Sequence, residues 1–207
     1  MTMISKRIPG HVERVGLFGG TFDPIHLGHL ILAGTAMEEL DLDRIIFIPA
    51  AISPYKQDQP PAASPEDRLG MIRSAIVEEP HFSVDDRELH REGPSYTIDT
   101  VRSLLGDYPG VRFLYLIGAD QLKELKGWQE ISELKNLIDF AVFDRAGVDC
   151  SDTGNYPVVH RRIDISSTEI RERLAMGLAV RNYLPSTVYD HIMTHSLYHS
   201  PRSDGQD

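Results

Sequence analysis

The most informative stretch of this sequence runs Gly16-Leu17-Phe18-Gly19-Gly20-Thr21-Phe22-Asp23-Pro24-Ile25-His26-Leu27-Gly28-His29-Leu30. Apolar and β-forming residues at 12–18 predict a short strand, and apolar residues at helical spacing predict a helix over 30–40. Glycines at the intervening turn let the backbone approach a ligand closely, and a helix start presents free N–H groups to an anion. This strand, turn and helix therefore predict a phosphate-binding site.

Two histidines add polar side chains to that site. His26 and His29 stand three residues apart at the helix start, so both side chains can face the same ligand. The stretch contains neither the dinucleotide-binding pattern Gly-x-Gly-x-x-Gly nor the Gly-Lys-Ser/Thr of a Walker loop. Zinc is disfavoured, because His-x-x-His lacks a companion pair and Cys150 is the one cysteine of the chain. The alternative interpretation is a tight turn with two surface histidines.

Composition and charge limit the classes of protein to which the chain can belong. Its 207 residues, 41% hydrophobic and 25% charged, suit one α/β domain with a sizeable core. The formal net charge of −10 argues against a nucleic-acid partner. The first ten residues lack the apolar segment of a signal peptide, and no apolar run approaches the ~18–20 residues of a membrane span. We expect a cytoplasmic protein that binds neither nucleic acid nor membrane.

Strand-like and helical patterns alternate along the rest of the chain, which predicts a parallel sheet with helices on both faces. The expected further strands are 44–49, 82–84 (near an edge), 111–118, 138–143 and 158–159. One further helix is expected to begin at Ser64. Four others are expected over 95–106, 122–137, 166–174 and 185–195. The fold class is α/β, a Rossmann-like doubly wound parallel sheet with a small C-terminal helical part. We expect one domain over residues 1–199 and a disordered tail at 200–207.

A second polar group, Ile165-Ser166-Ser167-Thr168-Glu169-Ile170-Arg171, begins one of the predicted helices. Three hydroxyls at a helix N-terminus and an arginine one turn later suit a polyphosphate, because N–H groups, hydroxyls and a guanidinium converge. The same residues suit ordinary helix capping, so alone they leave both interpretations open. Elsewhere, Gly118-Ala119-Asp120 follows the predicted central strand, at the sheet edge where open α/β folds place ligands.

Taken together, the two motifs resemble those of a known family. The run Gly-Gly-Thr-Phe-Asp-Pro-Ile-His-Leu-Gly-His at 19–29 is similar to the first signature of the nucleotidylyltransferase superfamily, and 165–171 resembles its second. Both have the form found in nicotinate-nucleotide adenylyltransferases, and weaker matches extend the resemblance from about Val15 to Tyr198. One departure is Ser53-Pro54-Tyr55-Lys56, where the family more often has Pro-Pro-His-Lys.

The resemblance implies a reaction of NAD biosynthesis, in which ATP and nicotinate mononucleotide give nicotinate adenine dinucleotide and pyrophosphate. It implies catalytic roles for His26 and His29, with Mg²⁺ as cofactor and no metal ligand among the side chains. Asp120 is expected to contact the ribose of ATP. The residues assigned to ATP are Gly19, Gly20, Thr21, Phe22, Gly28, Gly118, Asp120, Ile165, Ser166, Ser167, Thr168 and Arg171.

The residues assigned to nicotinate mononucleotide are Lys56, Tyr96, Thr97, Trp128 and Arg145. Helix N–H groups near Tyr96 and Thr97 suit a carboxylate better than an amide, which predicts preference for the nicotinate over the nicotinamide nucleotide. For Trp128 the alternative is simple core packing. Arg68 is a second candidate for the nucleotide phosphate, with a helix-surface ion pair as the alternative.

Several alternatives remain at the level of sequence. The rival functions are adenylyl transfer to another phosphate ester, such as nicotinamide mononucleotide or phosphopantetheine, and a non-catalytic nucleotide sensor of the same fold. His191, His195 and His199 recur every four residues, where a metal site competes with ordinary helix-end histidines. Asp23-Pro24 is expected to form a turn whose aspartate accepts hydrogen bonds from backbone amides. The oligomeric state is left open, a homo-oligomer included.

Overall fold

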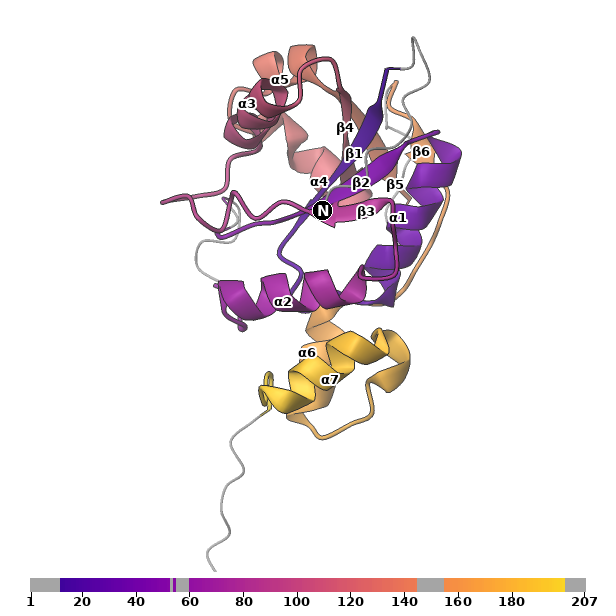
Figure 1. The fold of residues 1–207 in the computed structure, drawn as a ribbon, viewed down its shortest axis with the longest axis vertical. Coiled ribbons are helices and arrows are strands. Elements are labelled where there is room, and N and C mark those ends of the chain that lie inside the picture. The colour runs from indigo at the N-terminus through magenta and orange to yellow at the C-terminus, as the bar shows by residue number, and fades with distance from the viewer. Residues whose placement is uncertain (1–11, 53, 55–59, 145–154, 200–207) are drawn as a thin grey trace, which may run out of the picture.

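A computed structural model describes residues 12–52, 54, 60–144 and 155–199. Within these residues, six parallel strands form one sheet in the order β3-β2-β1-β4-β5-β6 (Figure 1). The strands are β1 Arg14–Gly20, β2 Arg44–Pro49, β3 Phe82–Val84, β4 Arg112–Gly118, β5 Asp139–Phe143 and β6 Val158–Val159. The winding of the chain reverses between β1 and β4, which are neighbours in space. The predicted doubly wound α/β fold is therefore confirmed, with β3 at an edge of the sheet as expected.

Each face of the sheet carries its own hydrophobic core, because successive side chains of a strand point to opposite sides. In β4, Phe113, Tyr115 and Ile117 belong to one core, whereas Leu114 and Leu116 belong to the other. Helices α3, α4 and α5 cover the first core, and α1, α2, α6 and α7 cover the second (Figure 1). A continuous apolar run such as that of β4 is thereby explained by burial on both faces.

The helices that cover these cores match most of the sequence-based expectations. Their bounds are α1 Leu27–Glu39, α2 Pro65–Ala75, α3 Thr97–Asp107, α4 Ala119–Glu124, α5 Ile131–Leu137, α6 Ser167–Ala175 and α7 Ser186–Thr194, with short 3-10 turns η1 Leu125–Gly127 and η2 Arg181–Tyr183. Ser64 caps α2 by accepting a hydrogen bond from the Asp67 amide at 3.0 Å, and Pro65 occupies the first helical position. These are the start signals that predicted the helix.

Some boundaries differ from the prediction. Gly19 and Gly20, expected in the turn, are the last residues of β1 and pair with the end of β2. The single helix expected over 122–137 is divided into α4, η1 and α5, with Glu130 in the left-handed region at φ 50°. The division occurs where Trp128 becomes extended and places its indole beside Tyr115 and Phe140. Burial of the tryptophan therefore outweighs continuation of the helix.

The small C-terminal helical part is formed by α6, η2 and α7, which lie below α2 in Figure 1. Val188 and Ile192 of α7 are buried in the same core as Met71 and Ile72 of α2. The Thr187 hydroxyl also donates to the carbonyl of Ser74 at 2.9 Å. Residues 200–207, expected to form a tail, lie outside the described residues. In the described ranges, every helix is too short or too polar to cross a bilayer.

Candidate active site

A cavity of about 440 Å³ opens at the carboxyl ends of β1 and β4, where the winding of the sheet reverses. Open α/β sheets bind ligands at this position because the loops leaving adjacent strands diverge there. Both sequence motifs, 19–29 and 165–171, contribute to its lining. The cavity also includes the start of α3 and the region of Trp128, on the opposite side of β1 from α1.

The glycines at the end of β1 leave room for aromatic neighbours. A Cβ atom at Gly19 would collide with the Tyr115 hydroxyl, and one at Gly20 would lie 3.0 Å from the Phe22 ring. Phe22 itself has φ 51°, so the chain turns sharply between β1 and α1. Gly28 is constrained similarly, since its Cβ would lie 3.0 Å from His26 Nδ1. These glycines therefore allow close packing beside the cavity as well as backbone access to it.

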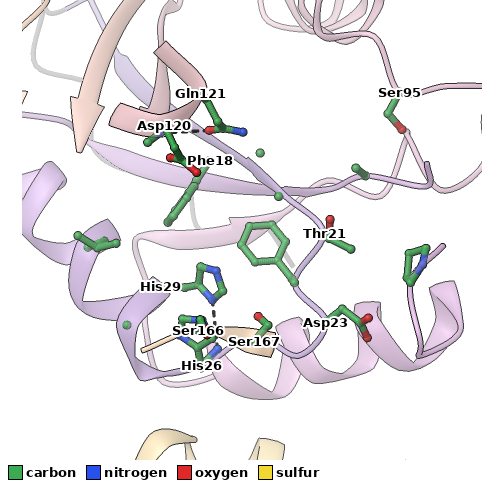
Figure 2. A pocket seen from close by; sticks show the side chains of 18 of the residues that line it. Phe18, Thr21, Asp23, His26, His29, Ser95, Asp120, Gln121, Ser166 and Ser167 are labelled. Carbon is green, nitrogen blue, oxygen red and sulfur yellow. Dashed lines mark hydrogen bonds between the residues drawn. The ribbon is translucent and has the colours of Figure 1, made fainter. Parts of the chain in front are cut away.

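His26 and His29 lie together at the start of α1 (Figure 2). Their rings are stacked with centroids 3.7 Å apart, and the His26 amide donates to His29 Nδ1 at 3.3 Å. Because Nδ1 accepts this hydrogen bond, the neutral His29 ring carries its proton on Nε2. Phe18 and Phe22 contact the His29 ring edge-on, at centroid distances of 5.9 and 5.0 Å. The His29 ring is thus held in place with an N–H donor at its far end.

Asp23 anchors the turn that precedes these histidines. Asp23 is only 5% exposed, and its carboxylate accepts hydrogen bonds from the amides of Ala62 and Ala63, at 2.7 and 3.1 Å. It also accepts one at 2.7 Å from the hydroxyl of Tyr198, whose pKa is raised by burial and by the charge of Asp23. The expectation that Asp23 binds backbone amides is confirmed, although the amides belong to the segment before α2 and not to its own turn.

The second motif docks directly onto the first. Ser167 Oγ donates to the carbonyl of Pro24 at 2.8 Å, and Arg171 Nη1 donates to the carbonyl of Asp23 at 2.7 Å. Ser166 caps α6 by accepting a hydrogen bond from the Glu169 amide at 3.1 Å, so the capping interpretation of this residue is correct. Figure 2 shows Ser166 and Ser167 beside His26. Residues separated by more than 140 positions therefore form one polar surface of the cavity.

The end of β4 and the region of α3 and Trp128 also contribute residues that the sequence assigns to the substrates. Gly118 and Asp120 lie at the end of β4, where the Gly118 amide donates to Gln121 Oε1 at 3.1 Å (Figure 2). Tyr96 precedes the first residue of α3, Thr97, and both line the cavity. Trp128 lines it as well, while contacting Tyr115 edge-on at 5.7 Å. The tryptophan thus belongs to the core and to the cavity, which combines the two alternatives raised by the sequence.

Within the described residues, every residue that the sequence assigns to ATP lines this cavity, as do three of those assigned to the mononucleotide. The set that lines it is Gly19, Gly20, Thr21, Phe22, His26, Gly28, His29, Tyr96, Thr97, Gly118, Asp120, Trp128, Ile165, Ser166, Ser167, Thr168 and Arg171. Lys56 and Arg145 lie outside the described residues. The individual roles of all these side chains stay predictions.

The position of Arg68 contradicts both sequence-based expectations, phosphate binding and a helix-surface ion pair. Its side chain is fully buried, and among the described residues it forms no surface ion pair and is not part of the cavity lining. Nη1 donates to the carbonyls of Thr21 and Ala50, at 2.7 and 2.8 Å, which ties together the segments leaving β1 and β2. Burial lowers the pKa of the Arg68 guanidinium, and the charge of Asp23 opposes that shift.

Some cavity residues were not anticipated. Asp144 and Arg161 line it just after β5 and β6, so they stand in the same relation to their strands as Asp120 does to β4. That relation is a signal that the sequence contained. Glu88 and Ser95 also line the cavity, but they come from irregular segments whose position only the tertiary structure defines.

Glu88 leads to a prediction about pH. The residue is only 5% exposed, and burial raises the pKa of its carboxyl although Thr100 donates a hydrogen bond to it at 2.7 Å. The folded state therefore binds the proton more tightly than the unfolded chain, whose glutamates titrate near ~4.3. The contribution of Glu88 to the free energy of unfolding is therefore largest below that pH, and it is lost as the pH rises through the pKa of the folded state.

Glu88→Gln should remove this dependence, because the amide does not ionise. We expect urea unfolding at pH 5 and pH 7 to show a smaller loss of unfolding free energy with rising pH in Glu88→Gln than in the unaltered protein. A suitable control is Glu92→Gln, at an exposed position on the same segment. Equal pH dependence in Glu88→Gln and the unaltered protein would contradict the assignment.

Comparisons with known proteins agree with this geometry. A family model described as cytidylyltransferase-like matches residues 17–173. In structure, the chain is similar to a Plasmodium falciparum nicotinic acid mononucleotide adenylyltransferase complexed with NaAD, with a TM-score of 0.75 and 19% identity over 90% of this chain and 97% of the other. At that identity the likeness establishes the fold. The fold, the family model and the two joined motifs together define a nucleotidyltransferase.

Relatives that are more similar in sequence indicate which kind of nucleotidyltransferase this is. A probable nicotinate-nucleotide adenylyltransferase of Shouchella clausii is 43% identical over 191 residues, covering 90% of this chain and 97% of the relative. One from Thermus thermophilus is 41% identical over 187 residues, covering 89% and 99%. The chain belongs to the cytidylyltransferase-like family and, within it, to the nicotinate-nucleotide adenylyltransferases.

Proposed function

We propose that this enzyme transfers the adenylyl group of ATP to nicotinate mononucleotide, giving nicotinate adenine dinucleotide and pyrophosphate. The observation that carries the proposal is the junction of the two motifs. Ser167 and Arg171 bind the carbonyls of Pro24 and Asp23, which brings the start of α6 beside the stacked imidazoles of His26 and His29. One triphosphate can therefore receive imidazole N–H groups, hydroxyls, a guanidinium and helix N–H groups together.

The chemistry requires charge compensation more than a base. The attacking phosphate of the mononucleotide loses its second proton near pH ~6, so it is already a nucleophile at neutral pH. Two unit charges ~4 Å apart repel by about 4 kcal/mol at an effective dielectric of ~20. The Nε2–H of His29 and the guanidinium of Arg171 would offset this repulsion at the phosphates. Catalysis then consists of positioning and stabilisation of negative charge.

Mg²⁺ is the metal proposed for the triphosphate. The second motif supplies neutral hydroxyl groups, and two of the residues that carry them, Ser166 and Thr168, line the cavity. Oxygen ligands suit Mg²⁺, which in such sites is held mainly by substrate phosphates and water. The hydroxyls would therefore bind the triphosphate, and the metal would arrive with ATP and be held by its phosphates and by water, with no side chain as ligand. When bound, the ion would supply further positive charge at the phosphates.

The acceptor is proposed to bind between α3 and Trp128. The first amides of a helix have no partner within it, and Thr97 opens α3 beside the cavity. A carboxylate there gains from the helix dipole, whereas a neutral amide gains less. Ser95 supports this turn, because its hydroxyl accepts a hydrogen bond from the Ala51 amide at 3.0 Å. Trp128 would contact the pyridine ring from the opposite side.

The test is pyrophosphate release from ATP with a panel of acceptors. We expect turnover with nicotinate mononucleotide, and a kcat/KM for nicotinamide mononucleotide about 10-fold lower, which corresponds to ~1.4 kcal/mol at the helix start. Phosphopantetheine should not react. Equal or better use of the amide nucleotide would contradict the assigned carboxylate site. ATP binding without release of pyrophosphate from any acceptor would favour the nucleotide sensor.

A further inference from the structure

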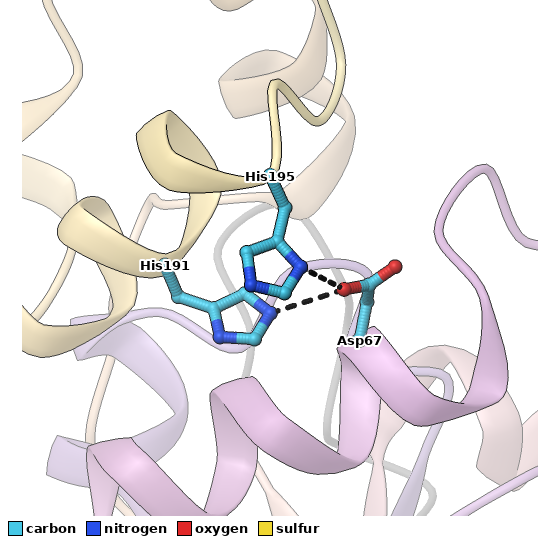
Figure 3. A group of neighbouring side chains, drawn as sticks. All are labelled: Asp67, His191 and His195. Atoms are coloured by element: carbon cyan, nitrogen blue, oxygen red, sulfur yellow. Dashed lines mark hydrogen bonds and ion pairs between the residues drawn. The ribbon is translucent and has the colours of Figure 1, made fainter.

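Outside the lining of the cavity, α2 and α7 bring together three side chains of the types that bind metals. Asp67 lies in the first turn of α2, His191 lies in α7, and His195 directly follows α7 (Figure 3). Asp67 Oδ1 is 3.2 Å from His191 Nε2 and 2.8 Å from His195 Nδ1. The two imidazole rings are stacked with centroids 4.1 Å apart. The three potential ligand atoms all lie within 4.8 Å of one another.

Neighbouring residues hold this arrangement in place. Ser64 Oγ donates to Asp67 Oδ2 at 2.8 Å, which leaves Oδ1 as the oxygen that faces both histidines. A Cβ atom at Gly70 would lie 2.9 Å from His191 Cε1, so the glycine leaves space for that ring. A hydrogen bond to a ligating carboxylate orients it for the metal and increases affinity. The carboxylate and one imidazole are thus positioned by residues that are not themselves ligands.

We propose that Asp67, His191 and His195 form a binding site for Zn²⁺ that fastens α7 to α2. Three ligands at ~2.0–2.1 Å around a tetrahedral ion stand about 3.3 Å apart, close to the two distances observed here. Two imidazoles and one carboxylate favour Zn²⁺ over Mg²⁺, because Mg²⁺ prefers ligands that are all oxygen. His195 is half exposed, with 48% of its side chain accessible, so an ion can enter from solvent.

The site is separate from the proposed reaction. None of its three ligands lines the cavity described above. The ion would connect α7, in the C-terminal helical part, to α2. A bound ion stabilises the folded state by its binding free energy, because the unfolded chain lacks the assembled ligands. The expected effect is therefore on stability, with turnover under Mg²⁺-ATP unchanged.

The test uses the full chain without a histidine tag, after treatment with a chelator. Calorimetric titration with Zn²⁺ should give one ion per chain, and a saturating concentration should raise Tm by at least about 4 °C. Co²⁺ in place of Zn²⁺ should give visible d–d absorption typical of a tetrahedral site. His195→Ala and Asp67→Asn should each weaken Zn²⁺ binding by at least about 10-fold. Because His195 is half exposed, the first variant is expected to fold.

Two further variants make the result specific. His90→Ala is the matched control, since His90 Nε2 lies 3.7 Å from Asp86 Oδ2 without a third ligand in the described residues, and it should bind Zn²⁺ unchanged. Gly70→Ala removes no ligand but displaces the His191 ring, so it should weaken binding while the protein remains folded. Failure of the unaltered chain to bind Zn²⁺, or binding equally strong in His195→Ala and Asp67→Asn, would overturn the proposal.

Discussion

Replacement of His29 by alanine is expected to lower kcat by about 10²-fold or more, with little change in KM for ATP. The reason is that Nε2–H of His29 is a fixed donor, with the ring held by the His26 amide and by the edges of Phe18 and Phe22. A donor directed at charge that develops during the reaction contributes mainly to the transition state. Steady-state measurement of pyrophosphate release with ATP and nicotinate mononucleotide gives both constants.

Two conservative variants distinguish the role of the Nε2–H donor of His29 from that of the hydrogen bond that its Nδ1 accepts. His29→Asn can still accept the His26 amide near the Nδ1 position but has no group at Nε2, so its kcat should fall as far as that of His29→Ala. His29→Gln carries an amide N–H nearer the Nε2 position and should retain more activity. His81→Ala, outside the cavity, is the control and should leave kcat unchanged. An unaltered kcat in His29→Ala would refute the proposed role of His29.

The second large effect is expected on stability. Arg68→Met should lower the free energy of unfolding by about 2–4 kcal/mol, because the carbonyls of Thr21 and Ala50 lose a charged donor inside the protein. The removal of a buried charge offsets part of this loss, since burial already lowers the pKa of Arg68. Urea unfolding followed by circular dichroism gives the difference directly.

Arg73→Met provides the matched comparison on the same helix. Arg73 is exposed and pairs with Asp86 at 3.1 Å, so its loss should cost no more than about 1 kcal/mol. Arg68→Met should also weaken ATP use, because Thr21 lines the cavity and loses its link to the segment after β2. If Arg68→Met were as stable as Arg73→Met, the buried guanidinium would not be needed to hold the segments that leave β1 and β2 together.

Much of the fold was predictable from local patterns. The bounds of β2 and β3 agree with the apolar runs that predicted them, and Ser64 and Ser166 cap α2 and α6 as their side chains suggest. Parallel strands buried on both faces give continuous apolar runs, and hydroxyls at helix starts satisfy free N–H groups. Such patterns depend only on residues that are close together in the chain, so they can be recognised from the sequence alone.

Where prediction was wrong, a distant contact overrode a local preference. The helix expected over 122–137 is interrupted because Trp128 packs against Tyr115 of β4 and Phe140 of β5. Arg68 has the pattern of a solvent-facing helix residue, but the carbonyls that bind it come from segments leaving β1 and β2. Nothing near residue 68 in sequence indicates those acceptors.

By itself, the sequence determined the family, the doubly wound sheet and the composition of the two motifs, because each is encoded in short runs of residues. Only the tertiary structure decided that Ser167 and Arg171 bind the carbonyls of Pro24 and Asp23, and that Asp67 meets His191 and His195. Such contacts join segments more than 100 residues apart. Their geometry depends on how helices pack on the sheet, and on side-chain distances that no local pattern contains.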